Sequence, residues 1–237
     1  MLLCLLALGG CGRTGDGGPS DVRSGNGDSD APVVATLGDS IVAGSPYWDP
    51  DEDVRGSLAD VDRDSQWQRW VDTDANLRNC GVWGERTDEI ALRYDDCTDG
   101  AEAVVIQGGI NDIAQGRSVA DAATTLACLG ERARGDGLDV AFVEVLPWNR
   151  GDAATADQIN DLNARIHDIA RRGGVPVLDF HDVLDDPEDP DRMPEELTVE
   201  GDHPNVAGYR LLGERAWRTP TRPTGAFAGG CQDGDDA

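Results

Sequence analysis

Short apolar runs alternate with longer amphipathic stretches through the middle of the chain. The runs are rich in β-branched residues and stop at Gly or polar residues, a pattern typical of buried parallel strands. We expect strands at residues 33–37, 76–80, 103–107, 140–145 and 175–180.

Helical spacing of apolar residues marks the stretches between these runs. Residues 119–133 have one apolar face behind a Ser-x-x-Asp start, and a second long helix begins near Thr155 and ends at the pair Gly173 and Gly174. A shorter helix is expected around residues 90–94, and a last one begins near Val206. Strands that alternate with helices predict βαβ crossovers and a parallel sheet covered on both faces.

The two ends of the chain differ in composition from this middle part. Residues 1–10 read as the short apolar region of a signal peptide, and the sequence LGGC that ends at Cys11 resembles a bacterial lipobox, which implies lipidation of Cys11. Residues 12–31 are rich in Gly, Ser and Asp and predict a tether. Residues 32–219 form the expected single domain, and residues 220–237 an irregular tail unless Cys231 fixes it.

Charge narrows the possible partners. Of the 237 residues, 46 are acidic and 20 basic, every basic one is Arg, and the formal charge is −26. Such a surface repels nucleic acid and anionic lipid headgroups, so nucleic-acid binding is not expected. The alternating acids Asp49, Asp51 and Asp53 resemble the start of a calcium loop, but Val54 and Asp60 stand where that loop needs Gly and Glu. We therefore expect neither a metal nor another cofactor.

Groups suited to nucleophilic catalysis lie at the predicted carboxyl ends of strands. Ser40 follows the first strand, Gly84 the second and Asn111 the third, and His203 stands just before the last helix. Ester hydrolysis by Ser needs a base, a carboxylate that orients the base, and donors for the developing oxyanion. Because parallel strands end at one edge of a sheet, we expect these groups to meet there.

Four sequence blocks, TLGDS, NCGVWGERT, GGIND and EGDHPNVAGY, together resemble the SGNH or GDSL hydrolase family over residues 33–217. The resemblance implies a flavodoxin-like, three-layer α/β/α fold whose five-stranded parallel sheet has the order 2-1-3-4-5. It also implies that Ser40 is the nucleophile and His203 the general base. The oxyanion donors would be the amides of Ser40 and Gly84 and the side chain of Asn111.

The acid that orients the base has two candidates. The family has Asp three residues before the His, and this position holds Glu200, while Asp202 stands directly beside His203. We expect Glu200, because a residue three positions earlier in a tight turn can fold its carboxylate under the ring. Asp202 stays open as the alternative. His167 and His181 are expected in surface or structural roles.

The four cysteines beyond the amino-terminal segment have no Cys-x-x-Cys spacing, which favours disulfides over zinc. The helices after strands two and three should be neighbours on one sheet face, which favours a Cys97–Cys128 bridge and leaves Cys80 for Cys231.

The function expected from these features is that of an exported serine esterase, either secreted or anchored to the cell envelope through Cys11. Acidic segments at residues 49–53 and 185–196 favour a neutral substrate, such as a short-chain ester or an acetylated glycan. An acyltransferase that uses the same Ser and His is one alternative. A non-catalytic glycan-binding lipoprotein is the other.

Overall fold

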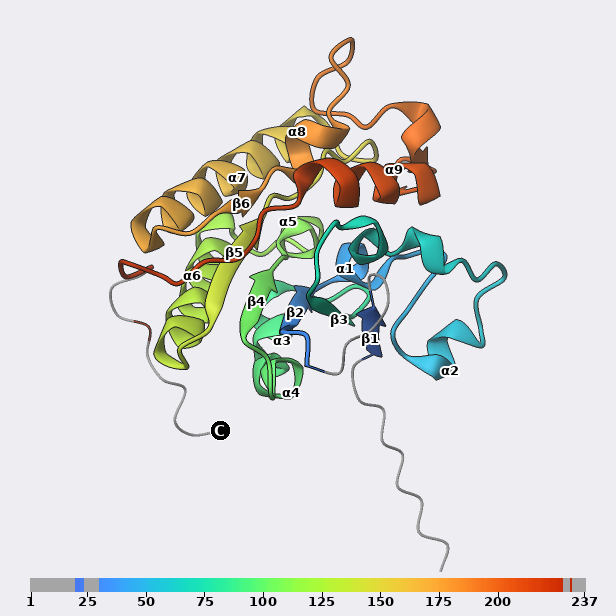
Figure 1. Cartoon of the computed structure of the whole chain (residues 1–237). Coiled ribbons are helices and arrows are strands. Elements are labelled where there is room, and N and C mark those ends of the chain that lie inside the picture. Colours follow the sequence, from blue (N-terminus) through green and yellow to red (C-terminus); the bar gives the residue numbers. More distant parts are fainter. Residues whose placement is uncertain (1–19, 24–29, 228–230, 232–237) are drawn as a thin grey trace, which may run out of the picture.

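A six-stranded sheet organises the computed structural model, which describes residues 20–23, 30–227 and 231. The strand order is β1-β3-β2-β4-β5-β6, and the five strands from β3 to β6 are parallel (Figure 1). In chain order these five strands give 2-1-3-4-5, so the predicted sheet is confirmed. Their bounds are β2 Val33–Gly38, β3 Asn76–Gly81, β4 Ala103–Ile106, β5 Asp139–Val143 and β6 Val177–Leu178.

The sixth strand is β1, Ser20–Arg23, which pairs antiparallel with β3 at the edge of the sheet. These four residues lie within the stretch 12–31 that is expected to be a tether, and the structure has them as a strand. An edge strand such as β3 carries unpaired backbone groups, and even a weakly apolar segment can satisfy them. The predicted signal peptide at residues 1–10 and the lipidation site Cys11 lie outside the described residues.

Helices cover both faces of the sheet. On one face lie α3 (Thr87–Leu92), α4 (Tyr94–Thr98), α6 (Val119–Gly135) and α7 (Ala153–Gly173), which enclose the larger apolar core. The other face packs against α8 (Phe180–Leu184), α9 (Val206–Leu211) and the π-helical turn η4 (Leu212–Ala216) around Trp67. The remaining short elements are α1 Ser40–Ala43, α2 Glu52–Arg55, η1 Arg63–Ser65, η2 Trp67–Trp70, α5 Ile110–Ala114, η3 Glu195–Leu197, and the hairpin of β7 Thr198–Val199 and β8 His203–Pro204.

Side-chain caps set the ends of the long helices. Ser118 Oγ accepts a hydrogen bond from Asp121 N at 3.1 Å at the start of α6, as the sequence predicts. At α7 the cap is Asp152, whose Oδ1 accepts from Thr155 N at 2.9 Å, so this helix begins before the expected Thr155. Gly174 ends α7 with a φ of 71°, a left-handed conformation that favours Gly.

Both disulfides differ from the predicted pairing. Cys80 is bonded to Cys97, with Cα atoms 5.9 Å apart, and Cys128 is bonded to Cys231, with Cα atoms 5.4 Å apart. The helices after β3 and β4 are indeed neighbours on one face. However, α3 and α4 are so short that the chain returns Cys97 to β3 itself, within reach of Cys80. Cys128 is left to face the carboxyl-terminal segment.

The described residues 220–227 of that segment form no helix, pair with the sheet only at the Val140–Thr221 bridge, and are packed against the domain. Phe227 is fully buried and its ring lies 5.6 Å from that of Phe142. Gly130 and Gly173 make room for it, because a Cβ at Gly173 would lie only 2.0 Å from Phe227 Cε1. Two features therefore attach the carboxyl-terminal segment to the domain: the buried ring of Phe227 and the Cys128–Cys231 bond.

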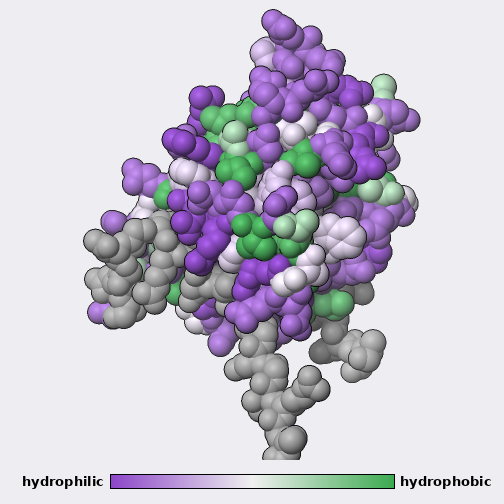
Figure 2. Space-filling model, turned by 90° about the vertical axis from the view of Figure 1, so that its right-hand side faces the viewer, coloured by the Kyte–Doolittle hydropathy of each residue, from purple (hydrophilic) through white to green (hydrophobic). Residues whose placement is uncertain are grey.

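The surface is largely hydrophilic. Figure 2 shows one face on which polar residues cover most of the area and apolar residues form small separate groups. Within the described part of the chain, no helix is both long and apolar enough to cross a membrane.

Candidate active site

Ser40 stands at the carboxyl edge of the sheet, on the tight turn between β2 and α1. The turn needs close backbone approaches on both sides. A Cβ at Gly38 would lie 2.5 Å from Gln107 Oε1, and one at Gly81 would lie 2.0 Å from Ala43 N. These two glycines therefore allow α1 to start directly above the ends of β2 and β3.

Hydrogen bonds of the Asp39 and Gln107 side chains fix the conformation of this turn. Asp39 is fully buried, and its Oδ1 accepts from Ile41 N at 2.9 Å as the cap of α1. Gln107 donates its Nε2 to Asp39 Oδ2 at 3.2 Å and accepts the Asp39 amide at 3.1 Å. Burial raises the pKa of Asp39 to about 6, against the opposing effect of these hydrogen bonds. The pair holds the backbone that carries the Ser40 hydroxyl.

His203 meets Ser40 across the cleft, with Nε2 2.9 Å from Ser40 Oγ. The ring sits on the β7–β8 hairpin, which Thr198 fastens by donating its hydroxyl to the His203 carbonyl at 2.8 Å. Burial lowers the pKa of His203, the negative charge of Asp202 raises it, and Arg150 lowers it. A depressed pKa keeps the ring neutral, and a neutral ring can accept the hydroxyl proton.

The carboxylate beside the His203 ring is that of Asp202, whereas the expected Glu200 faces another hollow. Asp202 Oδ2 lies 3.8 Å from His203 Nδ1. Trp148 Nε1 donates to Asp202 Oδ1 at 2.8 Å, and Arg150 Nη1 donates to Oδ2 at 3.3 Å. Glu200 is exposed, has a φ of 53°, and faces a separate hollow together with Gly201. The left-handed backbone at both residues turns the Glu200 side chain away from the base.

The residues expected to supply the oxyanion donors, Ser40, Gly84 and Asn111, line the same cleft as His203, a hollow of about 330 Å³. Gly84 has a φ of 78° on the loop that follows β3. Asn111, near the start of α5, donates its side-chain amide to Glu85 O at 2.9 Å. An amide NH₂ group has two N–H donors, so this contact fixes the group and leaves the second donor for a ligand.

Comparison with known proteins agrees with this constellation. The family model of the GDSL-like lipase/acylhydrolase family matches residues 36–211, which is more than half of the chain. The chain belongs to this family. It is accordingly a serine ester hydrolase.

Solved structures of GDSL proteins share the fold. A member of the lipolytic protein G-D-S-L family from Veillonella parvula has 20% identity and a TM-score of 0.62, over 77% of this chain and 94% of that one. A GDSL-like lipase from Bacteroides thetaiotaomicron has 20% identity and a TM-score of 0.59, over 81% and 88%. The lipase/acylhydrolase from Enterococcus faecalis has 22% identity and a TM-score of 0.59, over 77% and 91%. No curated protein matches the chain.

The walls of the GDSL cleft are largely apolar. One wall is the stretch of residues 145–148, which Asn163 holds by hydrogen bonds to the backbone N and O of Val145 at 2.8 and 2.9 Å. At the mouth, Trp83 leaves 68% of its surface exposed. An exposed indole in the wall of this cleft offers a flat apolar contact for the part of a substrate outside the ester.

Sequence reasoning did not identify Trp148, Arg150 or Gln107. The first two belong to the stretch PWNR after β5, where a polar group at a strand end is the available signal. Gln107 ends the third predicted strand, and its partner Asp39 lies 68 residues earlier. Nothing local in the sequence connects such pairs.

The other two histidines lie away from the cleft. His167 Nε2 lies 2.7 Å from Glu144 Oε1, and the backbone N of His181 donates to Glu144 Oε2 at 3.0 Å. In the described ranges no three His, Cys, Asp or Glu side chains are grouped so that they could hold a metal ion.

The acidic segments expected around the cleft differ from each other. Asp49 is buried rather than part of a rim, and burial raises its pKa. Asp186, Asp189 and Glu195 instead line the second hollow with Glu200. This hollow, of about 700 Å³, is lined by Asn149, Glu200 and Gly201, which stand next in the sequence to the cleft residues Trp148, Asp202 and His203. Of the two acidic segments, residues 185–196 therefore supply negative charge next to the site.

Proposed function

We propose that this GDSL hydrolase cleaves a neutral carboxylic ester through an acyl-enzyme on Ser40. The observation that carries the proposal is the 2.9 Å contact between Ser40 Oγ and His203 Nε2 in a cleft that also presents Gly84 and Asn111. A hydroxyl, a neutral imidazole and a set of amide donors are the groups that acyl transfer needs.

In the first half-reaction Ser40 Oγ attacks the carbonyl carbon while its proton passes to His203 Nε2. The carbonyl oxygen becomes an oxyanion, held by the amides of Ser40 and Gly84 and the free N–H of Asn111. When the tetrahedral intermediate collapses, the C–O bond to the alcohol breaks and the alkoxide takes the proton from Nε2. The carboxylate of Asp202 stabilises the imidazolium that forms in between.

In the second half-reaction water replaces the alcohol. His203 removes a proton from the water as it attacks the acyl carbon, and the same donors hold the second oxyanion. Collapse breaks the bond to Ser40 Oγ, which takes the proton back from His203. The products are the alcohol and the carboxylic acid, and the enzyme returns to its starting state.

A neutral substrate is supported by the charge around the site. Four acidic side chains line the neighbouring hollow, and the formal charge of the whole chain is −26. An anionic ester would be repelled by such a surface, which raises the free energy of its approach. A short-chain ester or an acetylated glycan avoids this cost.

The test measures hydrolysis of acetyl, butyryl and octanoyl esters and of acetylated polysaccharides by the wild type, Ser40→Ala and His203→Ala. We expect turnover by the wild type, loss of at least about 10³-fold in both variants, and labelling of Ser40 by a fluorophosphonate. Acyl transfer to an added sugar in preference to water would make the protein an acyltransferase. Absence of both turnover and labelling would support the glycan-binding alternative.

The proposed location is outside the cytoplasm. Two disulfides fit an oxidising compartment, and the LGGC sequence before residue 12 supports a lipid anchor on Cys11. Mass spectrometry of the chain expressed in a bacterial host should find diacylglycerol on Cys11 and none in Cys11→Ala. An unmodified, released wild-type protein would instead indicate secretion.

A further inference from the structure

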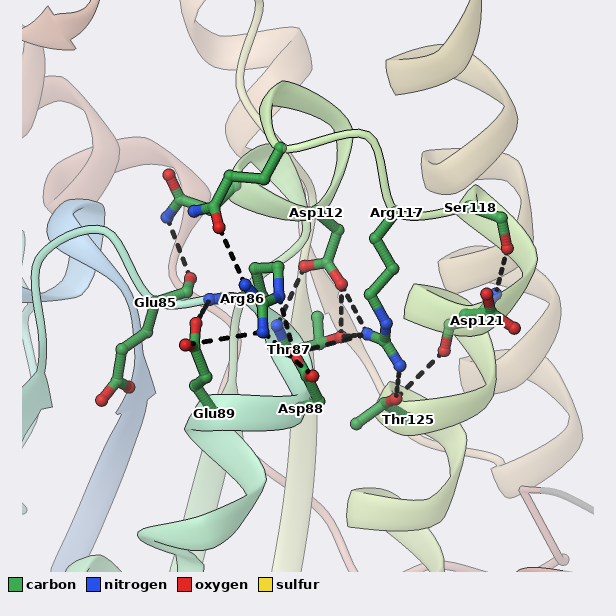
Figure 3. A network of polar contacts seen from close by, with 12 residues as sticks. Glu85, Arg86, Thr87, Asp88, Glu89, Asp112, Arg117, Ser118, Asp121 and Thr125 are labelled. Atoms are coloured by element: carbon green, nitrogen blue, oxygen red, sulfur yellow. Dashed lines mark hydrogen bonds and ion pairs between the residues drawn. The ribbon is translucent and has the colours of Figure 1, made fainter.

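Asp112 is a fully buried carboxylate that the proposed reaction does not use. It follows Asn111 directly in α5, and Figure 3 shows its side chain pointing toward Thr87 at the start of α3. Burying a carboxylate costs free energy unless hydrogen bonds and a counter-charge compensate for lost water. The hydrogen-bond partners of Asp112 therefore indicate which part of the structure this buried carboxylate holds in place.

Its main partner is Thr87, the first residue of α3. Asp112 Oδ2 accepts from the Thr87 backbone N at 2.9 Å, and Oδ1 accepts from Thr87 Oγ1 at 2.8 Å. Arg117 completes the group, donating Nη1 to Asp112 Oδ1 and to Thr87 Oγ1, both at 2.6 Å (Figure 3). Thr87 is thus held through both its backbone and its side chain.

Two further contacts join α5 to the loop that precedes Thr87. Asn111 donates to Glu85 O at 2.9 Å, and Gln115 donates to Gly84 O at 3.0 Å. Consequently Asn111 and Asp112 of α5, together with Gln115 at its carboxyl end, hold three points of the loop 84–87. Gly84 and Asn111, the two oxyanion donors outside the nucleophile turn, lie on the two sides of this junction.

We propose that Asp112 is a positioning residue that sets the distance between the Gly84 and Asn111 donors. The inference rests on the proposed function. Asp112 does not line the cleft, so it acts through Thr87 and the backbone of the loop. Donors stabilise an oxyanion only when they are fixed at its position before the reaction, and small displacements of catalytic groups cost large factors in rate.

The test is Asp112→Asn. An Asn has one acceptor oxygen and one NH₂ group, so it cannot accept from the Thr87 backbone, the Thr87 hydroxyl and Arg117 in the same way. We expect kcat for a neutral ester to fall by about 10²-fold, the loss typical of one misplaced oxyanion donor, with KM changed less than about threefold. Affinity for a boronic acid, which mimics the tetrahedral intermediate, should fall in parallel with kcat.

A double-mutant cycle separates positioning from a structural role. In an Asn111→Ala background the donor pair is already broken, so Asp112→Asn should lower kcat only a few-fold further, while its effect on thermal stability stays the same. Thr87→Val serves if Asp112→Asn does not fold, and should lower kcat about tenfold with the same dependence on Asn111. Tyr94→Phe is the control: it removes the hydrogen bond from Tyr94 Oη to Asp136 Oδ2 on the same sheet face, and should leave kcat unchanged.

Wild-type kcat in folded Asp112→Asn, or an equal loss with and without Asn111, would overturn the inference. The proposed function fails by a different result. If Asn111→Ala alone keeps wild-type kcat, the oxyanion assignment itself is wrong, whatever Asp112 does.

Discussion

The carboxylate of Asp202, which lies 3.8 Å from the Nδ1 of His203, is itself held by two donors. Trp148 fixes one oxygen of Asp202 at 2.8 Å, and Arg150 contacts the other at 3.3 Å. A carboxylate held in this way lies next to Nδ1 and stabilises the positive charge that appears on the ring during attack. Glu200 faces another hollow, so its carboxylate does not lie next to Nδ1 of His203.

The first prediction compares these two acids. Asp202→Ala should lower kcat by about 10²- to 10⁴-fold, since loss of the orienting acid of a triad costs up to about 10⁴. Glu200→Ala should change kcat less than about threefold, as expected of an exposed charge. Steady-state kinetics at matched thermal stability measures both. Near wild-type activity in Asp202→Ala together with a large loss in Glu200→Ala would restore the original assignment.

The second prediction concerns the pH at which the base loses its proton. Activity needs neutral His203, so kcat/KM should rise with pH and level off, with a midpoint below the usual 6.5 because burial lowers the pKa. Asp202 raises this pKa and Arg150 lowers it. The midpoint should therefore move up in Arg150→Met and down in Asp202→Asn. Profiles of kcat/KM from pH 4 to 8 decide, and an unchanged midpoint in Arg150→Met contradicts this electrostatic account.

The residues of the site were not equally accessible from the sequence. Ser40, Gly84, Asn111 and His203 each stand in a short motif. The shared edge of the parallel sheet explains why the first three meet, whereas His203 comes from the separate β7–β8 hairpin. Which acid lies beside His203 depends on the backbone conformation of a three-residue turn and on Trp148, 54 residues before Asp202. Such a choice is made by tertiary contacts, which neither spacing nor composition records.

At the scale of elements, the βαβ units determine most of the architecture. Right-handed crossovers and the resemblance to GDSL proteins were enough for the sheet order, and periodicity was enough for α6 and most of α7. The tail after η4 has no periodicity, so its path along α6 and α7 could not be predicted. The wrong disulfide pairing had two causes: the short α3 and α4 return Cys97 to β3, and the position of Cys231 could not be predicted.

The third prediction tests the disulfides. Peptide mapping without reduction should recover Cys80 with Cys97 and Cys128 with Cys231. Cys231→Ser should lower the free energy of unfolding by about 2–4 kcal/mol, because the bond closes a long loop. Neither Cys128 nor Cys231 lines the cleft, so kcat at 25 °C should stay the same. Denaturant unfolding and ester kinetics measure the two effects, and recovery of Cys97 with Cys128 would contradict the pairing.

At the scale of the whole molecule, an excess of negative charge surrounds a largely apolar cleft. The formal charge is −26, and several cations near the site are already paired, Arg150 with Asp202, Arg86 with Asp88 and Arg93 with Glu85. The net field at the cleft should therefore be negative. Between exposed charges this field is screened over a Debye length of about 30 Å at 0.01 M salt and about 3 Å at 1 M.

The last prediction uses this screening to measure the field. A neutral ester, 4-nitrophenyl butyrate, and an anionic one, 4-nitrophenyl hydrogen succinate, have similar size and the same leaving group. At 0.01 M salt the anionic ester must approach against the whole negative surface, whereas at 0.5 M it meets only the nearest charges. The ratio of kcat/KM for the anionic to the neutral ester should therefore rise several-fold over this range, on the order of 3- to 10-fold. The neutral ester provides the internal control for any effect of salt on folding or on the chemical step. A ratio that stays flat or falls would mean that local cations govern the cleft, and the preference for neutral substrates would lose its electrostatic basis.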